Sequence, residues 1–456
     1  VYTLDDTIAA ISTPIGAGGI GIVRMSGPEA RAIGRRLFVP ERGVDGGWPE
    51  PYRLYYGHVR APETGRVVDE ALLSYMQAPR SFTRQDVVEI NAHGGAVALR
   101  EILALCLSIG ARPAREGEFT LRAFVNGRID LAQAEAVLDI VRAKTEASLR
   151  VAVDQLGGRL SQAVRAARQG LLSVLAYLQA SVDFAEDDIP WQDIAPDLRQ
   201  AQARLQALLR EAEQGMIYRQ GVRAAIVGRP NVGKSSLLNA LLRSDRAIVT
   251  PIPGTTRDTL EETLDLQGIP LVFVDTAGLT ASENLVERLG VERSRRAIAQ
   301  ADVVLWVVDG NAPLQEGDRE VAALAEGRPT VVVVNKCDLP RVWDGEALLP
   351  SAPQLAVSAL TGEGLVALEA HLAEMILAGQ VAIAEGAMAS SPRHRDLLQR
   401  ALACVREAQR ALAAGAPLDL LSIDLSEAVA ALGEITGETA SEELLETSFG
   451  QFCIGK

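Results

Sequence analysis

The chain has 456 residues, a length that suits two to four domains of ordinary size. Its composition, 48% hydrophobic and 23% charged, is typical of folded globular proteins and excludes a disordered or collagen-like chain. The 45 basic and 59 acidic residues leave a net charge of −14, which argues against a protein that coats DNA through a strongly basic surface. RNA binding through a local basic face stays open.

Cysteine and histidine are few and scattered, so we expect neither a disulfide framework nor a cysteine/histidine zinc site. The cysteines form no CxxC pair and stand at Cys106, Cys337, Cys404 and Cys453. The longest apolar runs, such as residues 303–308, are too short to cross a membrane. The first ten residues contain two acids and no basic residue, so we expect no signal or transit peptide and a cytoplasmic location.

The first part of the chain mixes short β-like runs, at residues 20–24, 67–75 and 87–91, with a helix-like stretch at 96–108. Glycine and proline separate these runs. The pattern predicts an α+β domain over residues 1–118.

One glycine-rich segment in this domain resembles a nucleotide loop. Residues 16–21 match GxGxxG, the pattern of dinucleotide-binding turns. Such a turn has to open a helix, whereas residues 22–25 have the composition of a strand. We therefore expect a glycine-rich hairpin here.

In the rest of the chain the predicted secondary structure changes from helical to alternating α/β and back to helical. Heptad-like apolar spacing over residues 119–216 predicts long amphipathic helices, interrupted at Gly157–Gly158. Residues 217–378 alternate β-branched runs with helical segments, which is typical of a parallel sheet. Residues 379–456 return to helix, with helices predicted at 393–414, 422–432 and 442–447. The simplest architecture is an α/β domain inserted into a helical domain of two segments. The β-branched runs are residues 224–227, 271–274, 303–308, 331–334 and 355–357.

A phosphate-binding loop is predicted at residues 228–235, which fit GxxxxGK[ST]. The motif follows the strand at 224–227 and opens a helix at 236–242, as such a loop requires. Its glycines let backbone N–H groups surround the phosphates, and the helix dipole adds to the attraction. We expect Lys234 to reach the β- and γ-phosphates and Ser235 to ligate Mg²⁺.

Three further motifs follow strands in the order of a GTP site. Asp275-Thr-Ala-Gly278 provides a carboxylate that can hold Mg²⁺ through water and a glycine N–H for the γ-phosphate. In Asn335-Lys-Cys-Asp338 the carboxylate of Asp338 can accept both N1–H and N2–H of guanine, which adenine cannot offer. Ser358-Ala-Leu360 would contact guanine O6 through backbone N–H groups. Strand ends on one edge of a sheet are where such ligands bind, so the sequence predicts GTP binding.

Residues 254–258, between the phosphate loop and Asp275, contain threonines that could close on the nucleotide. We assign Thr256 to Mg²⁺. The residue after the Asp275 motif is Leu279, so this chain does not use a glutamine there to orient water. Glu287 is the candidate base, and the alternative is that it is a solvated helix glutamate.

Lysine is rare in this chain: only Lys144, Lys234, Lys336 and Lys456 stand against 41 arginines. A lysine retained in such a chain suggests a place that needs a compact ammonium group. Two of the four fall inside the nucleotide motifs. Lys144 is interpreted as a chance occurrence on a helix.

Beyond the nucleotide motifs, the chain resembles the MnmE (TrmE) family of bacterial tRNA-modification GTPases over essentially its whole length. The resemblance rests on segments spread along the sequence, the most distinctive being the final Cys-Ile-Gly-Lys456. The others are Gly18 to Arg24, Ser81-Phe-Thr83, His93-Gly-Gly95, Gly117-Glu-Phe119, Asp130 to Glu135, Gly254 to Asp258 and Ile435-Thr-Gly437.

The resemblance implies an α/β P-loop GTPase domain at 217–378 inserted into an all-α domain made of 119–216 and 379–456, behind a tetrahydrofolate-binding and dimerisation domain at 1–118. It further implies a homodimer that works with MnmG, an FAD- and NADH-dependent partner. Together they would place an aminomethyl or carboxymethylaminomethyl group on C5 of the wobble uridine of tRNA. A 5-formyl- or 5,10-methylene-tetrahydrofolate would supply the carbon, and GTP hydrolysis would require K⁺, Mg²⁺ and pairing of the GTPase domains.

Site residues carry over from the family by position. Glu287 matches its water-orienting glutamate, and Cys453 matches a cysteine that matters for modification. Positions that match its K⁺ ligands are Asn231, Thr250, Ile252 and Thr255, and those that match folate contacts are Arg24, Glu89, Arg128 and Lys456. Positions expected at GTP are Asn231, Val232, Gly233, Lys234, Ser235, Ser236, Thr250, Pro251, Ile252, Pro253, Gly254, Thr255, Thr256, Asp275, Thr276, Ala277, Gly278, Asn335, Lys336, Asp338, Ser358, Ala359 and Leu360.

The chain departs from the family at three of these places: Arg128 stands for a lysine, Leu360 for a basic residue, and Thr280 for a basic residue of some relatives. Two other functions remain open. One is an RNA- or ribosome-assembly switch with the same GTPase core, although no second GTPase domain or KH-type GxxG module is visible. The other is a GTPase whose flanking domains are a dimerisation scaffold only. Folate binding separates the three.

Overall fold

The computed structural model places the chain in two compact units. The first unit contains Val1–Leu138 and Val429–Lys456, and the second contains most of the chain between them. The residues that the structure describes are 4–14, 16, 18–41, 48–183, 190, 192–243, 247–248, 262–274, 287–342, 349–350, 352–377 and 391–456.

The first unit is built on a seven-stranded sheet in the order β3-β4-β5-β6-β2-β1-β7. Helices α1 (Ala30–Leu37) and α2 (Ala96–Ser108) pack on one face of it around a core that includes Leu99. Along the middle of β2, buried residues alternate with partly exposed ones, as expected for a strand that has one face on the core. The strands are β1 (Ile8–Ile11), β2 (Gly18–Ser26), β3 (Phe38–Pro40), β4 (Leu54–Arg60), β5 (Val67–Met76), β6 (Val87–Gly94) and β7 (Arg112–Pro113).

The glycine-rich segment at residues 16–21 leads into β2, which pairs antiparallel with β1, as the predicted hairpin requires. No helix follows it. Gly21 packs beneath α2, because a Cβ there would lie 2.3 Å from a methyl carbon of Leu99. The need for this glycine is therefore helix packing and not phosphate binding.

A buried ionic network joins this sheet to α3 (Glu118–Val125). Arg122 is fully buried and pairs with Asp6 and with Glu118, whose carboxylate also accepts a 2.6 Å bond from Arg112. Burial raises the pKa of Glu118, but the bonds from Arg112 and from the Arg115 N–H outweigh it and hold the pKa below its usual value. Helices α4 (Leu131–Arg142) and α15 (Glu442–Phe449) complete the neighbouring apolar cluster.

The second unit contains the other sheet, in the order β14-β13-β12-β8-β11-β10-β9. Its first five strands are parallel, and β10 pairs antiparallel with both β11 and β9. Nearly continuous apolar runs, rich in valine, form the central strands β12 and β13 because both faces of the sheet are buried. The strands are β8 (Val222–Val227), β9 (Ala247–Ile248), β10 (Glu262–Leu266), β11 (Ile269–Phe273), β12 (Val303–Asp309), β13 (Thr330–Asn335) and β14 (Gln354–Ala356).

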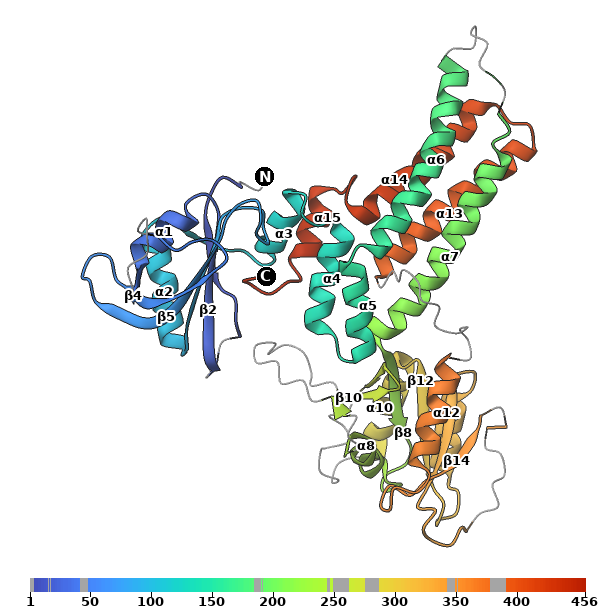
Figure 1. The fold of residues 1–456 in the computed structure, drawn as a ribbon. Coiled ribbons are helices and arrows are strands. Elements are labelled where there is room, and N and C mark those ends of the chain that lie inside the picture. The colour runs from blue at the N-terminus through green and yellow to red at the C-terminus, as the bar shows by residue number, and fades with distance from the viewer. Residues whose placement is uncertain are drawn as a thin grey trace. The chain divides into compact units, whose positions relative to one another are not determined.

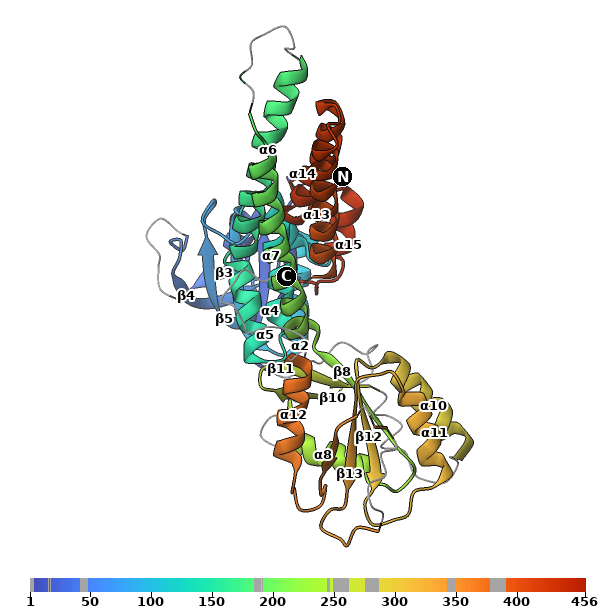
Figure 2. The same cartoon turned by 90° about the vertical axis from the view of Figure 1, so that its right-hand side faces the viewer.

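Among the described residues, four helices cover this sheet. Helices α8 (Lys234–Arg243) and α12 (Leu365–Leu377) pack on one face, whereas α10 (Glu287–Gln300) and α11 (Glu316–Ala325) pack on the other (Figure 2). The described loops that follow β8, β13 and β14 lie at one edge of the sheet, and they contain the nucleotide motifs at 228–235, 335–338 and 358–360.

Long helices from both sides of this sheet in the sequence pack together. Helix α7 (Ala195–Gln220) lies beside α13 (Pro392–Ala413), although the whole α/β segment separates them in the chain (Figure 1). The remaining helices are α5 (Glu146–Leu156), α6 (Arg159–Asp183) and α14 (Leu418–Thr436). None of the helices in the described ranges combines the length and hydrophobicity that a membrane crossing needs.

The expectation that Lys144 lies on a helix is wrong. Lys144 lies in the loop before α5, and its Nζ donates to Thr263 Oγ1 of β10 at 3.4 Å. The next residue, Thr145, caps α5 and also donates to the carbonyl of Gly268 in the β10–β11 turn at 2.8 Å. Sequence separation of more than 100 residues hid this contact from pattern analysis.

Candidate functional site

The loop after β8 is shaped by glycines that leave no room for side chains. A Cβ on Gly228 would lie 2.3 Å from the carbonyl oxygen of Val307, and one on Gly233 would lie 2.1 Å from Nδ2 of Asn335. Gly228, Asn231 and Gly233 all have positive φ, a conformation that glycine and asparagine tolerate best. This loop runs into the N-terminus of α8, so its geometry is that of an anion-binding nest.

Lys234 opens α8 and points back into the loop. Its Nζ donates to the carbonyl of Arg229 at 2.6 Å, and burial lowers the pKa of this amine to about 8. Ser235 and Ser236 follow in the first turn of α8, and Val232 is buried beneath the loop. The loop therefore brings an ammonium group, two hydroxyl groups and the backbone N–H groups at the start of α8 together, and these are the groups that bind a polyphosphate.

The depressed pKa of Lys234 predicts a pH-dependent affinity. Phosphates favour the charged amine and raise its pKa, so binding takes up a proton once the pH exceeds about 8. We expect GDP affinity to be constant below this pH and to fall by up to about tenfold per pH unit above it. Fluorescent GDP titrations between pH 7 and 9 measure this, and Lys234→Ala should give weak binding with a flatter profile. A parent profile as flat as that of the variant would contradict the prediction.

Asn335, at the end of β13, ties two loops together. Its Nδ2 donates to the carbonyl of Val232 at 2.9 Å, and its Oδ1 accepts from the backbone N–H of Ala359 at 3.0 Å. Ser358 is fully buried, and its Oγ accepts from Thr361 N. One amide therefore contacts both the phosphate loop and the loop at 358–360.

The residues after Asn335 form the expected purine side of the site. Lys336 has φ +66 and its Nζ bonds to Asp309 Oδ2 at 2.6 Å and to the carbonyl of Asn231 at 3.4 Å. Asp338 is exposed in the next turn, as is Leu360 in the loop that follows β14. The structure thus brings residues 231–236, 335–338 and 358–360 to one edge of the sheet.

Asp309 was missed by the sequence analysis, although a signal for it existed. It ends β12, so it lies at the same sheet edge as the other strand-terminal motifs. Its carboxylate holds the amine of Lys336.

Several predicted site residues lie outside the described residues. These are Thr250, Pro251, Ile252, Pro253, Gly254, Thr255, Thr256, Asp275, Thr276, Ala277 and Gly278. Glu287 is the first residue of α10, and only its backbone is described. The assignments of these residues stay predictions.

In the first unit, the residues expected at folate lie near one another. Arg24 of β2 stands directly opposite Glu89 of β6 in register, and their side chains form a 2.7 Å ion pair. The guanidinium of Arg24 also donates to the carbonyl of Gly455 at 3.3 Å and lies 5.7 Å from the centre of the Phe119 ring. These contacts bring the final residues of the chain to the open face of the sheet.

Arg128 and Lys456 complete this group. Arg128 lies 5.1 Å from the centre of the Phe82 ring and donates to the carbonyl of Ser81 at 2.7 Å. Phe82 and Phe119 belong to one apolar cluster. The carbonyl of Lys456 accepts from the N–H of Phe119 at 3.2 Å, and Cys453 is a free, exposed thiol. Two guanidinium groups, a carboxylate and aromatic rings therefore surround one area.

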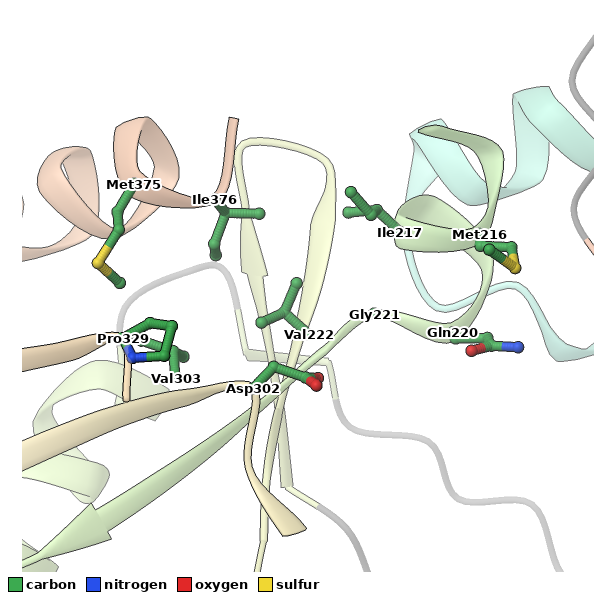
Figure 3. Close-up of a pocket in the computed structure, with 10 residues that line it drawn as sticks. All are labelled: Met216, Ile217, Gln220, Gly221, Val222, Asp302, Val303, Pro329, Met375 and Ile376. Carbon is green, nitrogen blue, oxygen red and sulfur yellow. The ribbon is translucent and has the colours of Figure 1, made fainter. Parts of the chain in front are cut away.

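A pocket of about 430 Å³ lies at the end of the second sheet that is opposite to the nucleotide motifs (Figure 3). It is lined by residues from the end of α7, the starts of β8 and β12, and α12, including Ile217, Val222, Asp302 and Ile376. Ligands of parallel sheets bind at the carboxyl ends of the strands. This pocket lies at the amino ends and is therefore separate from the nucleotide motifs.

Together the parallel sheet, the phosphate loop and the Asn335 turn define a P-loop GTPase. A model of the MnmE helical domain matches residues 131–453, and a model of the GTP-binding protein TrmE N-terminus matches residues 7–128. A tRNA modification GTPase MnmE of Chloroflexus aurantiacus is 52% identical, over 99% of this chain and 100% of that protein. One of Desulforamulus reducens is 45% identical over 99% and 100%. The chain belongs to the MnmE family of tRNA modification GTPases.

Among solved structures, the chain is similar to the G domain of the T. maritima FeoB iron transporter. The identity is 27% and the TM-score 0.25, over 34% of this chain and 98% of that one.

Proposed function

We propose that this GTPase hydrolyses GTP in a K⁺-dependent manner and uses the reaction to drive modification of the wobble uridine of tRNA. The observation that carries the proposal is the junction at Asn335, which joins the phosphate loop to the loops that would read guanine. The arrangement supports a GTPase domain at residues 217–378 inserted between two helical segments, 119–216 and 379–456, behind an N-terminal domain at 1–118. Packing of α7 on α13 supports the insertion.

Metal ions have oxygen donors available at the phosphate loop. Ser235 stands in the first turn of α8, where its hydroxyl would hold Mg²⁺ together with Thr256. Asn231, with φ +62, turns at the crest of the loop and would hold K⁺ with Thr250, Ile252 and Thr255. A hard cation of this kind offsets negative charge on the phosphates during transfer. Glu287 would orient the attacking water.

A K⁺ requirement is the direct test of this proposal. We expect GTP turnover in KCl to exceed that in NaCl by at least about tenfold at equal ionic strength, because a fixed cation stabilises the transition state. Steady-state phosphate release measures the ratio. Asn231→Ala should reduce the ratio to near one, whereas equal rates of the parent in both salts would refute the assignment of K⁺.

The first unit supports a tetrahydrofolate site. The flat rings of Phe82 and Phe119, the carboxylate of Glu89 and the two arginines suit a ligand with a planar ring that carries hydrogen-bond donors and an acidic tail. Arg24, Glu89, Arg128 and Lys456 would hold a 5-formyl- or 5,10-methylene-tetrahydrofolate, which supplies one carbon when bound. We propose that a homodimer carries out the modification in the cytoplasm with the FAD-dependent partner MnmG, forming an aminomethyl or carboxymethylaminomethyl group.

Folate binding distinguishes this function from the two alternatives. We expect Arg24→Ala to weaken binding of 5-formyl-tetrahydrofolate by about tenfold or more, since a charged hydrogen bond is lost, while GTP turnover is retained. Isothermal titration measures the affinity. Arg53→Ala, which removes an exposed arginine paired with Glu50, is the control. A parent protein that ignores the folate at millimolar concentration would favour an assembly switch or a scaffold.

A further inference from the structure

The second residue of the phosphate loop, Arg229, packs its side chain against the start of α11. Its Nε lies 2.7 Å from Oδ2 of Asp318 on α11. The Arg229 side chain is 16% exposed and that of Asp318 is 0% exposed. The positive charge of Arg229 is therefore neutralised within the protein and does not serve as a free cation for phosphate.

On the helix side, Asp318 is itself fixed. It is the third residue of α11, where its Oδ2 accepts from the backbone N–H of Gln315 at 2.9 Å in a capping box. Gly317 leaves space for the arginine, because a Cβ there would lie 3.2 Å from Cγ and Cδ of Arg229. The start of α11 is thus shaped to receive this side chain.

On the loop side, the backbone of Arg229 contacts the phosphate-binding lysine. The carbonyl of Arg229 accepts from Lys234 Nζ at 2.6 Å, and Asn231 follows two residues later. Helix α11 also packs against α10, which begins at Glu287. The ion pair therefore connects the phosphate loop to the pair of helices that starts with the predicted catalytic glutamate.

We propose that Asp318 is a positioning residue for GTP binding and hydrolysis, which acts through Arg229 to hold the phosphate loop in its ligand-binding shape. A buried ion pair is a weak source of stability, because desolvation of both charges offsets their attraction, and its better-attested role is to fix one arrangement. A phosphate loop needs such fixing, since a displacement of about 1 Å can cost about a hundredfold in rate. The inference rests on the assignment of residues 228–235 as the phosphate loop.

Gly317→Ala separates positioning from stability. Alanine favours a helix over glycine, so we expect an unchanged or higher Tm, while the new methyl group pushes Arg229 by a few tenths of an ångström. Positioning predicts that kcat/KM for GTP falls about threefold or more despite the retained stability. Gly170→Ala in α6 is the matched control, because the nearest atom to its new Cβ would be 3.9 Å away. It should leave kcat/KM for GTP unchanged.

A double-mutant cycle tests whether Asp318 acts through Arg229. We expect Asp318→Asn to lower kcat/KM about tenfold and to weaken GDP binding. In the Arg229→Met background the same change should have little further effect, because the pair is already absent. Glu320→Gln, at an exposed acid of α11, controls for loss of a negative charge. Thermal melts of each variant allow rates to be compared at equal folded fraction.

The outcomes distinguish this inference from the loop assignment on which it rests. Lys234→Ala should abolish tight GDP binding, and if it does not, the phosphate-loop assignment is wrong and the inference fails with it. If Lys234→Ala loses GDP while Gly317→Ala and Asp318→Asn keep the parent affinity and turnover, only the inference is overturned. Equal losses from Asp318→Asn in both arginine backgrounds would also overturn it.

Discussion

Asp338→Asn is expected to lower the affinity for GTP by at least about a hundredfold, because a hydrogen-bond donor of the side chain would then face a donor of guanine. The carboxylate of Asp338 can accept N1–H and N2–H of guanine together. An asparagine places its own N–H against N2–H. Xanthine carries a carbonyl oxygen at that position, so the variant should bind XTP better than the parent does. Competition binding with GTP, XTP and ATP measures all three affinities.

The gain for XTP is the informative part of this experiment, because a merely unfolded variant would bind neither nucleotide. Glu363→Gln, at an exposed acid of the following loop, is the control and should keep the parent preference. If Asp338→Asn binds GTP as tightly as the parent, Asp338 does not read the base.

Glu287→Ala should bind GTP normally yet hydrolyse it about a hundredfold or more slowly. A positioned carboxylate that orients or deprotonates water contributes roughly 10²–10⁴-fold to a rate, and Leu279 provides no side chain for that task. Single-turnover hydrolysis in KCl, with fluorescent GTP binding measured alongside, gives the rate and the affinity separately.

The alternative for Glu287 is a glutamate that is solvated at the start of α10, and it predicts unchanged turnover. Glu316→Gln removes an exposed acid from the first turn of α11 and serves as the matched control. A Glu287→Ala variant that turns over like this control would remove Glu287 from the mechanism.

Strong periodic patterns predicted most elements of the fold. Helix α2 has the predicted bounds, and α13 is displaced by one residue. The predicted helix at 422–432 is longer in the structure, because α14 starts directly after Pro417 and ends before Gly437, whose φ is +84. Strand β1, with the sequence IAAI, was missed because short, almost fully buried strands show no alternation.

The candidate site was predictable where its chemistry lies in contiguous motifs. The phosphate loop and the Asn335 turn are of this kind, since strand ends place them together. Contacts such as Arg229 with Asp318 or Lys144 with Thr263 join residues about 90 or more positions apart, and no spacing rule links them. Asp309 is intermediate: its place at the end of β12 was visible in the sequence, but its role became clear only through its bond to Lys336.

The side-chain amide of Asn335 makes two hydrogen bonds, one to each loop, and this makes binding of the two ends of a nucleotide interdependent. A base that orders the loop at Ser358 also fixes, through the same amide, the carbonyl of Val232. The phosphate loop then has less conformational entropy left to lose when the phosphates arrive. Guanosine and pyrophosphate offered as separate molecules should therefore favour each other's binding, and a nucleotide that fits at only one end forfeits this cooperativity.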